Sequence, residues 1–302
     1  MSTRTFTIVP QGEFSLRESA LFGFGQRVPF GQRLKAAGDD EFDGVMRLAF
    51  CLDGYSHQVG VEVRQDPAGV HCVVHGGGGL ATIKAQVARS FSLDHDGRRF
   101  AEVGARDPVI GRLQQAAPGL RPPLFYSPYE AAAWAVLSAR RPAAQMAQIR
   151  RELNDRHGAG FELAGQPAAA FPTPQQLLAV DHFPGLSAEK IERLHGVARA
   201  AADGRLDVAR LLALGPQEAI TDVQRIKGIG PFYSELVIIR ATGFTDVLPK
   251  NEPTVLDVVQ HLYGLASTPA PAELAALAEP WRPFRTWAIV LIRAAAGRLL
   301  PR

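Results

Sequence analysis

The sequence has little cysteine and no long apolar run. Its 302 residues include two cysteines, Cys51 and Cys72. Two thiols are too few for a disulfide framework or for an iron–sulfur cluster held by four thiolates, and their separation does not match a structural zinc motif. No stretch of about eighteen consecutive apolar residues occurs, so we expect no membrane-spanning helix.

An excess of charge of either sign is also lacking. Lysine and arginine number 33 and aspartate and glutamate number 30, which gives a formal net charge of +3. This balance permits a polyanionic partner but does not require one, because attraction depends on where the charges lie. The opening segment MSTRTFTIVP has no apolar run that could serve as a signal peptide. We expect a cytoplasmic monomer of two or three domains, without a membrane partner or a nucleotide cofactor.

The first 92 residues are predicted to form a mixed α/β domain. Short runs rich in β-branched and aromatic residues alternate there with glycine, aspartate and proline, which is typical of strands and turns. One helix is predicted after the capping pair Ser15 and Glu18, and another from Leu80 to Phe91. The predicted strands are Thr5–Val9, Val45–Leu52, Gln58–Arg64 and Val70–His75.

From residue 93 to residue 302 the pattern is helical. Ser127, Thr173 and Ser187 each stand at the N-cap position of a predicted helix, and proline follows the first two directly. The last helix is predicted at about Trp281–Leu299, with one apolar stripe that we assign to the core. The predicted fold class is therefore α+β, with a β-rich domain followed by a helical region.

A glycine turn between two predicted helices is the most informative stretch. One helix is expected from Pro216 to Gln224, and the next opens at Pro231. Gly228 and Gly230 permit backbone angles denied to other residues and let the chain approach a ligand closely. The amides of such a turn, with the helix N-terminus that follows, form an anion site suited to phosphate, and Lys227 adds a cation. By itself the pattern fits an ordinary helical hairpin equally well.

Other motifs surround this hairpin in a fixed order. They are Pro118-Gly-Leu-Arg121, Tyr129-Glu130, Phe171-Pro-Thr-Pro174, Ala201-Ala-Asp-Gly-Arg-Leu206, Asp246-Val-Leu-Pro-Lys-Asn-Glu252 and Trp281-Arg-Pro-Phe-Arg285. Together with the hairpin they resemble the 3-methyladenine DNA glycosylase II family, of the helix–hairpin–helix DNA glycosylase superfamily, over roughly residues 88–300. The resemblance implies a TBP-like N-terminal domain followed by a pair of helical domains, with the helix–hairpin–helix at about residues 216–241.

The implied activity is hydrolysis of the N-glycosidic bond of a damaged base, alkylated bases above all, after the nucleotide is flipped out of duplex DNA. Superfamily members that also nick the strand carry a lysine just after the glycine turn, where this chain has Phe232, so the abasic strand should stay intact. The family stabilises the cationic sugar with an aspartate, and the motif places Glu252 there. A catalytically impaired protein of the same fold that binds DNA lesions is the alternative.

The resemblance also implies particular contacts with DNA and with the flipped base. Arg140 should either wedge between bases or contact a phosphate. Arg293 falls where the family has an aromatic residue, and a cation there disfavours a positively charged base. The expected DNA contacts are Lys227, Gly228, Ile229, Gly230, Phe232, Arg140 and Arg141, and the expected pocket residues are Tyr126, Tyr129, Phe232, Tyr233 and Arg293.

The resemblance implies one ion. The family hairpin often holds a monovalent cation through backbone carbonyls, here those of Gln224, Ile226 and Gly228. Sodium or potassium would serve a structural role, and no further cofactor is expected.

Overall fold

A four-stranded antiparallel sheet opens the chain. The computed structural model describes residues 4–23, 42–249 and 253–300. The strands follow the order β1–β4–β3–β2 and confirm the four predicted strands to within two residues. Their bounds are β1 Arg4–Ile8, β2 Met46–Cys51, β3 Gln58–Asp66 and β4 Gly69–Gly76.

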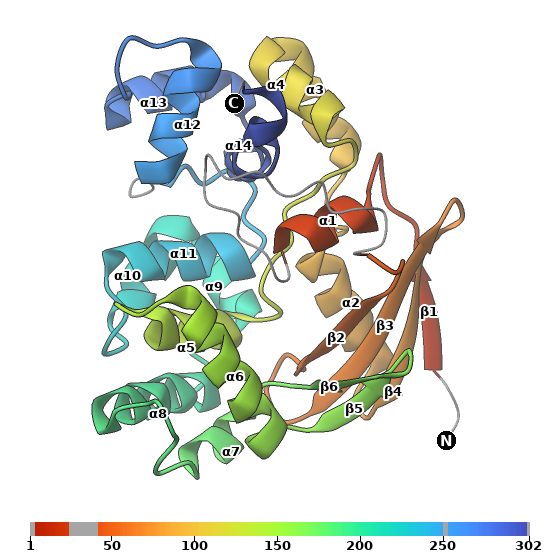
Figure 1. The fold of residues 1–302 in the computed structure, drawn as a ribbon, viewed down its shortest axis with the longest axis vertical. Coiled ribbons are helices and arrows are strands. Elements are labelled where there is room, and N and C mark those ends of the chain that lie inside the picture. Colours follow the sequence, from red (N-terminus) through yellow and green to blue (C-terminus); the bar gives the residue numbers. More distant parts are fainter. Residues whose placement is uncertain (1–3, 24–41, 250–252, 301–302) are drawn as a thin grey trace.

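Two helices cover one face of this sheet (Figure 1). They are α1, Leu16–Gly23, and α2, Leu80–Ser90, and both were predicted. Ile83 and Val87 of α2 are fully buried and join the alternating inward residues of the strands in one core. The N-cap of α1 forms as predicted, because the amide of Glu18 donates to Ser15 Oγ at 3.1 Å.

A β-hairpin inside the helical region corrects the expectation of an all-helical second part. Strands β5, Gly160–Leu163, and β6, Gln166–Ala169, are joined by the two-residue turn Ala164-Gly165, both with positive φ. The hairpin packs on β3 at Gly60, where a β-carbon would lie 2.8 Å from Leu163 Cδ2. Strands of four residues with an Ala-Gly turn carry a weak sequence signal, so tertiary packing decides this element.

The remaining described elements form two helical clusters with separate cores. The first cluster surrounds the predicted hairpin and consists of α5 Pro128–Ser138, α6 Ala143–His157, α7 Pro174–Leu178, α8 Ala188–Ala202, α9 Val208–Leu214, α10 Pro216–Gln224 and α11 Pro231–Ala241. The second combines helices that precede the first cluster in the sequence with helices that follow it. These are α3 Gly97–Arg106, α4 Pro108–Ala116, α12 Pro253–Tyr263, α13 Pro271–Leu277, the 3-10 turn Glu279–Trp281 and α14 Arg285–Leu299. None of the described helices has the length and apolarity that crossing a bilayer requires.

Most predicted helix starts match the structure. The side chains of Ser127, Thr173 and Ser187 each accept a hydrogen bond from the amide three residues later. The last helix begins at Arg285 rather than near Trp281, because Trp281 closes a separate turn and donates its indole N–H to Asp107 Oδ2 at 2.7 Å.

Glu130, in the first turn of α5, connects the sheet to the first helical cluster. Its carboxylate accepts from the amide of Cys51, at the end of β2, and from Arg150 at 2.7 Å. Burial raises the pKa of Glu130 above its usual value, although Arg150 and the Cys51 amide act in the opposite direction. Tyr55 adds a second link, because its hydroxyl donates to the carbonyl of Leu206 at 2.6 Å.

Candidate nucleic-acid interface and base pocket

The glycine turn joins α10 to α11 as the sequence predicts. Gly228 has φ +98°, and a β-carbon there would lie 2.8 Å from Arg193 Cδ, so both the backbone angle and the space favour glycine. Gly230 has φ −84° and ψ −178° and caps α11, with open space around its α-carbon. Ile229 between them is 3% exposed, packs in the core and donates its amide to the carbonyl of Ile226, so neither its side chain nor its amide is offered to a ligand.

The turn leaves backbone donors available. Lys227 and Gly230 are exposed, and Gly228 is half-buried. Within the described ranges, no residue accepts a hydrogen bond from the amides of Lys227, Gly228 or Gly230. These N–H groups lie at the N-terminus of an eleven-residue helix, where a phosphate oxygen is electrostatically favoured.

Backbone carbonyls in the same turn fit a cation. The carbonyl of Ile226 accepts from the amide of Ile229 at 3.0 Å, whereas no residue in the described part of the chain donates to the carbonyls of Gln224 or Gly228. Carbonyl oxygens with unused lone pairs are suitable ligands for hard cations such as sodium and potassium.

Asp222 holds the first helix of the hairpin in place. Its carboxylate accepts from Arg210 at 2.9 Å and lies 3.8 Å from Arg205 and 3.6 Å from Arg225. Burial by itself raises the pKa of Asp222, but the three guanidinium groups outweigh it and hold the pKa below its ordinary value. The orientation of α10 therefore depends on an ionised carboxylate.

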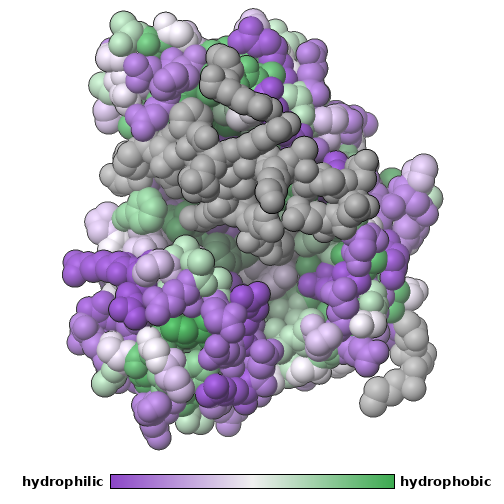
Figure 2. All heavy atoms as spheres, viewed as in Figure 1, coloured by the Kyte–Doolittle hydropathy of each residue, from purple (hydrophilic) through white to green (hydrophobic). Residues whose placement is uncertain are grey.

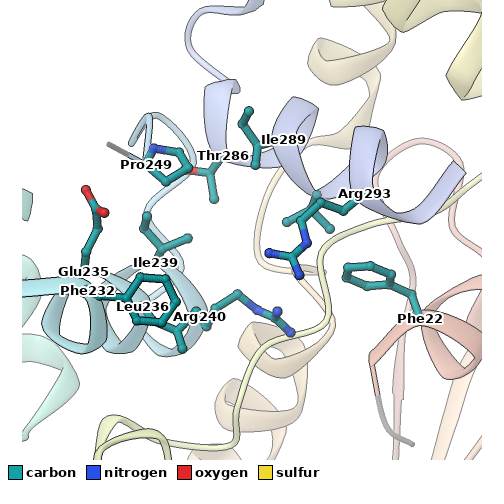
Figure 3. Close-up of a pocket in the computed structure, with 11 residues that line it drawn as sticks. Phe22, Phe232, Glu235, Leu236, Ile239, Arg240, Pro249, Thr286, Ile289 and Arg293 are labelled. Carbon is teal, nitrogen blue, oxygen red and sulfur yellow. The ribbon is translucent and has the colours of Figure 1, made fainter. Parts of the chain in front are cut away.

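The two clusters enclose a pocket between α11 and α14 (Figure 3). The residues of α11 that line it are spaced three or four apart, as are those of α14, so each helix presents one face. Phe232 stands at one end with 41% of its surface exposed, and the ring of Phe22 from α1 lies at the other. The cavity measures about 30 Å³, and its lining is Phe22, Phe232, Glu235, Leu236, Ile239, Arg240, Pro249, Thr286, Ile289, Val290 and Arg293.

Three of the lining residues carry charge. Arg240 donates to the carbonyl of Pro123 at 3.1 Å and lies over the ring of Phe22 at 5.8 Å. The side chains of Arg240 and Arg293 point toward each other across the space between α11 and α14, whereas Glu235 lies at the opposite end, near Pro249 (Figure 3). Glu235 is 8% exposed.

The structure brings two of the five expected pocket residues to this pocket, Phe232 and Arg293. Tyr233 is half-buried against the core of the first cluster, with its ring 5.2 Å from that of Phe232. Tyr129 is fully buried and donates its hydroxyl to the carbonyl of Pro172 at 3.0 Å. Tyr126 stacks on Phe50 at 5.0 Å, in the core of the sheet.

Glu235 and Arg240 are pocket residues that the sequence analysis missed. Both belong to α11 and follow Phe232 by three and eight residues, which places them on the same face of the helix. Following that face along the sequence from Phe232 would have found them. Phe22 carries no such signal, because tertiary packing alone brings α1 to this place.

Arg140 and Arg141 lie in an exposed turn after α5. Arg140 adopts φ +56°, a left-handed conformation that is costly for a residue with a β-carbon, and the amide of Arg141 donates to the carbonyl of Ser138 at 3.2 Å. Lys190 secures this end of α5 by donating its ammonium group to three backbone carbonyls, those of Val136, Leu137 and Ala139.

Two of the family motifs, those that begin at Asp246 and at Trp281, contact each other beside the pocket. Asp246 accepts from Arg282 at 2.8 Å and from Arg285 at 2.7 Å. The hydroxyl of Thr286 accepts from the amide of Val247 at 2.9 Å. These contacts fix the segment that leads from α11 to Pro249 against the start of α14. Glu252, the expected catalytic residue, lies outside the described residues.

The described surface offers few competing sites. No group of three or more histidine, cysteine, aspartate or glutamate side chains suited to a metal ion occurs among the described residues. Both cysteines are buried. On the face shown in Figure 2, polar side chains cover much of the described surface of both helical clusters.

Known proteins share this sequence pattern and fold. The DNA-3-methyladenine glycosylase of Bacillus subtilis is 24% identical over 206 residues, which are 66% of this chain and 67% of that protein. DNA-3-methyladenine glycosylase 2 of Escherichia coli is 27% identical over 61% of this chain and 63% of its own length, so the match leaves more than a third of that protein uncovered. No protein-family model matches the chain.

The solved structures extend the likeness over nearly the whole chain. A 3-methyladenine DNA glycosylase from Archaeoglobus fulgidus superposes with a TM-score of 0.73 at 20% identity, covering 96% of each chain. The fold is therefore that of the helix–hairpin–helix DNA glycosylases, with a small antiparallel sheet beside the helices. In sequence, the chain is similar to these proteins named DNA-3-methyladenine glycosylases over about two thirds of its length.

Proposed function

We propose that this protein is a monofunctional DNA glycosylase that removes a damaged base, alkylated bases being the expected class, from duplex DNA. One observation carries the proposal. The helix whose N-terminus presents the unused amides of the glycine turn also forms one wall of the pocket, so a backbone contact and a base site are built on a single rigid element. The relatives named as DNA-3-methyladenine glycosylases support this reading.

In the proposed complex the turn binds the DNA backbone. The amides of Lys227, Gly228 and Gly230 would donate to phosphate oxygens, with the ammonium group of Lys227 beside them. A sodium or potassium ion on the carbonyls of Gln224, Ile226 and Gly228 would stiffen the turn and add positive charge near the phosphate. Such contacts read the charge and geometry of the backbone rather than its sequence.

The exposed turn after α5 would contact the DNA on the other side of the flipped nucleotide from the glycine turn. Arg140 is held in a strained backbone conformation at an exposed position, which is common where a side chain must be aimed at a ligand. Its planar guanidinium can stack in the gap left by the flipped base, and Arg141 can neutralise a phosphate.

The proposed reaction is hydrolysis at the C1′ carbon of the flipped nucleotide. The N-glycosidic bond breaks and the base leaves with the bonding electron pair, so that a cationic alkylated base departs as a neutral molecule. A water oxygen forms the new bond to C1′, and the proton that this water loses passes to the solvent or, for an uncharged base, to the base. Positive charge develops on the sugar, and we assign its stabilisation to the carboxylate of Glu252. Because Phe232 has no amine, no covalent adduct with the sugar forms and the strand stays intact.

The sheet with α1 and α2 would correspond to the TBP-like N-terminal domain of the family. Phe22 of α1 contributes to the pocket, so this part completes the base site as well as supporting the helical clusters. We further propose that the protein acts in the cytoplasm as a monomer.

The test is base release from duplex DNA. Incubation with methylated duplex, followed by hot alkali, should give strand breaks at newly formed abasic sites, and Glu252→Gln should lose them by about 100-fold or more. Asp257→Asn is the matched control, because Asp257 is exposed on α12, and it should retain the wild-type rate. Tight lesion binding without release of alkylated, deaminated or oxidised bases would favour the lesion-binding alternative.

A further inference from the structure

Helix α8 contacts both of the turns that we propose to bind DNA. Lys190 and Arg193 are three residues apart, so they stand on the same side of this helix. The ammonium group of Lys190 donates to three carbonyls at the end of α5, where the turn with Arg140 and Arg141 begins. The stem of Arg193 lies against Gly228, since a β-carbon there would be 2.8 Å from Arg193 Cδ. One side of α8 therefore supports both turns.

The guanidinium group of Arg193 has hydrogen-bonding capacity that the described residues do not use. Its Nη2 donates to the carboxylate of Glu189, one turn earlier on α8. Its Nε is buried and has no acceptor among the described residues. The side chain keeps 32% of its surface exposed and lies beside Gly228, whose amide has no acceptor in the described part of the chain. A phosphate at the glycine turn can therefore reach the outer nitrogens of this guanidinium.

Glu189 is a partner that a phosphate can replace. Its side chain is 69% exposed, and the pair joins residues four apart on the helix surface. Exposed pairs of this kind add little to stability, because water screens the attraction and both long side chains lose freedom. A DNA phosphate carries a negative charge as the carboxylate does, and it likewise offers two oxygens to a guanidinium. The carboxylate and a phosphate therefore suit the same donor.

Cations gather around this pair. Burial lowers the pKa of the Lys190 ammonium group, and the charges of Arg141 and Arg193 lower it further. Such repulsion requires that the three cations lie close together, so the surface between the two turns favours a polyanion. Glu189 offsets part of this positive charge at Arg193.

We propose that Arg193 is a further ligand of the DNA phosphate at the glycine turn, and that Glu189 competes with that phosphate for its guanidinium. In the free protein the carboxylate accepts from Arg193. On binding, this hydrogen bond breaks and the same N–H donates to a phosphate oxygen, with no covalent change. Glu189 thereby lowers the affinity of the turn for any duplex, which favours release from undamaged DNA. The inference rests on the proposed function in one respect, that DNA binds at the glycine turn, and it does not depend on base removal.

The experiment is a titration of labelled, undamaged duplex DNA, followed by fluorescence anisotropy at salt concentrations between about 50 and 200 mM. Arg193→Met keeps the apolar stem against Gly228 and removes the guanidinium. It should lower the affinity by about ten-fold at the lowest salt and reduce the slope of log affinity against log salt by about 1. Glu189→Gln should raise the affinity at the lowest salt by about two- to five-fold.

The double variant tests whether Glu189 acts through Arg193. With Arg193→Met already present, Glu189→Gln should no longer raise the affinity. Glu152→Gln is the matched control, because Glu152 pairs with Arg156 four residues later on α6 and its loss changes the net charge equally. This control should bind duplex DNA as the wild type does.

Three results would overturn the proposal. Wild-type affinity and salt slope in Arg193→Met would remove Arg193 from the interface, and Arg193→Gln is measured instead if the methionine variant does not fold. An equal gain of affinity in Glu189→Gln and Glu152→Gln would show a general effect of charge. A gain from Glu189→Gln that persists without the Arg193 guanidinium would show direct repulsion of DNA rather than competition.

Base release from methylated duplex separates this inference from the proposed function. No base release by the wild type, together with the expected changes in binding, would refute the glycosylase activity and leave the Arg193 contact standing. Base release by the wild type, together with unchanged binding in Arg193→Met, would refute the contact and leave the activity standing.

Discussion

At the scale of single residues, the two glycines of the turn perform different tasks. Gly228 is required by the fold, since its φ of +98° and the neighbouring Arg193 side chain both exclude a β-carbon. Gly230 has an extended backbone and open space, so the folded chain itself accepts a side chain there. In the proposed complex, a β-carbon at residue 230 would contact the DNA backbone that binds at the turn.

Gly228→Ala should lower the free energy of unfolding by about 1–3 kcal/mol, because alanine must adopt a left-handed conformation and displace Arg193. Gly230→Ala should leave stability within about 0.5 kcal/mol of the wild type. Both should weaken binding to undamaged duplex at low salt. Urea denaturation and fluorescence anisotropy measure the two effects, and unchanged affinity in both variants would contradict phosphate binding by the turn.

Residue patterns predicted part of the site and missed part of it. Phe232 and Arg293 were expected at the pocket from the family motifs, and both line it. Tyr129 was also expected there, but an aromatic residue in the first turn of a buried helix packs as readily into a core, which is where it lies. Sequence alone cannot distinguish these outcomes because both faces of such a helix are apolar.

At the scale of elements, the β5–β6 hairpin depends on a glycine in another strand. Its backbone is held to the sheet by polar contacts, in which Arg47 donates to the carbonyl of Leu163 and Glu62 accepts from the amide of Ala164. The missing side chain of Gly60 provides the space into which Phe161 and Leu163 pack. Local propensity could not reveal this element, since the space for it is specified about a hundred residues earlier.

Gly60→Val should therefore destabilise the protein by about 1–3 kcal/mol through overpacking against the hairpin. Gly160→Val is the matched control, because a β-carbon at this position of β5 has no atom within 4 Å, and valine is favoured in strands. Thermal or urea unfolding measures both. A Gly60→Val protein as stable as Gly160→Val would show that the hairpin does not rest on β3 in this way.

At the scale of the whole molecule, one buried ion pair joins the sheet to the helices. The side chain of Glu130 is fully buried, and it is neutralised by Arg150 while bonding to the last residue of β2. The helix that carries Glu130 packs against α11, which lines the pocket. The N-terminal sheet and the candidate site are thus mechanically connected through α5.

Arg150→Met should lower the free energy of unfolding at neutral pH by about 3–5 kcal/mol, because an uncompensated carboxylate is left buried. Burial already raises the pKa of Glu130, and losing the guanidinium raises it further. The loss of stability in Arg150→Met relative to the wild type should therefore be smallest at acid pH, where the Glu130 carboxyl is protonated in both the folded and the unfolded state. The loss should grow as the pH rises through the raised pKa.

The control for this prediction is Arg199→Met, which removes an exposed partner of Glu192 and should leave the free energy of unfolding nearly unchanged at any pH. Chemical denaturation of both variants at several pH values gives the comparison. A loss of stability in Arg150→Met that did not change between acid and neutral pH would contradict the assignment of Glu130 as the titrating group.

The composition of the second helical cluster also constrains how the protein is made. Helices α3 and α4 cannot pack against α12–α14 until those helices have been synthesised, and 136 residues lie between Ala116 and Pro253. At ordinary rates of translation this delay is roughly 7 to 27 s. Throughout that interval the apolar core residues of α3 and α4 lack the helices that later bury them; these residues are Phe100, Val103, Ile110 and Leu113. Until the C-terminal helices emerge from the ribosome, a chaperone or the newly folded sheet must cover this apolar surface.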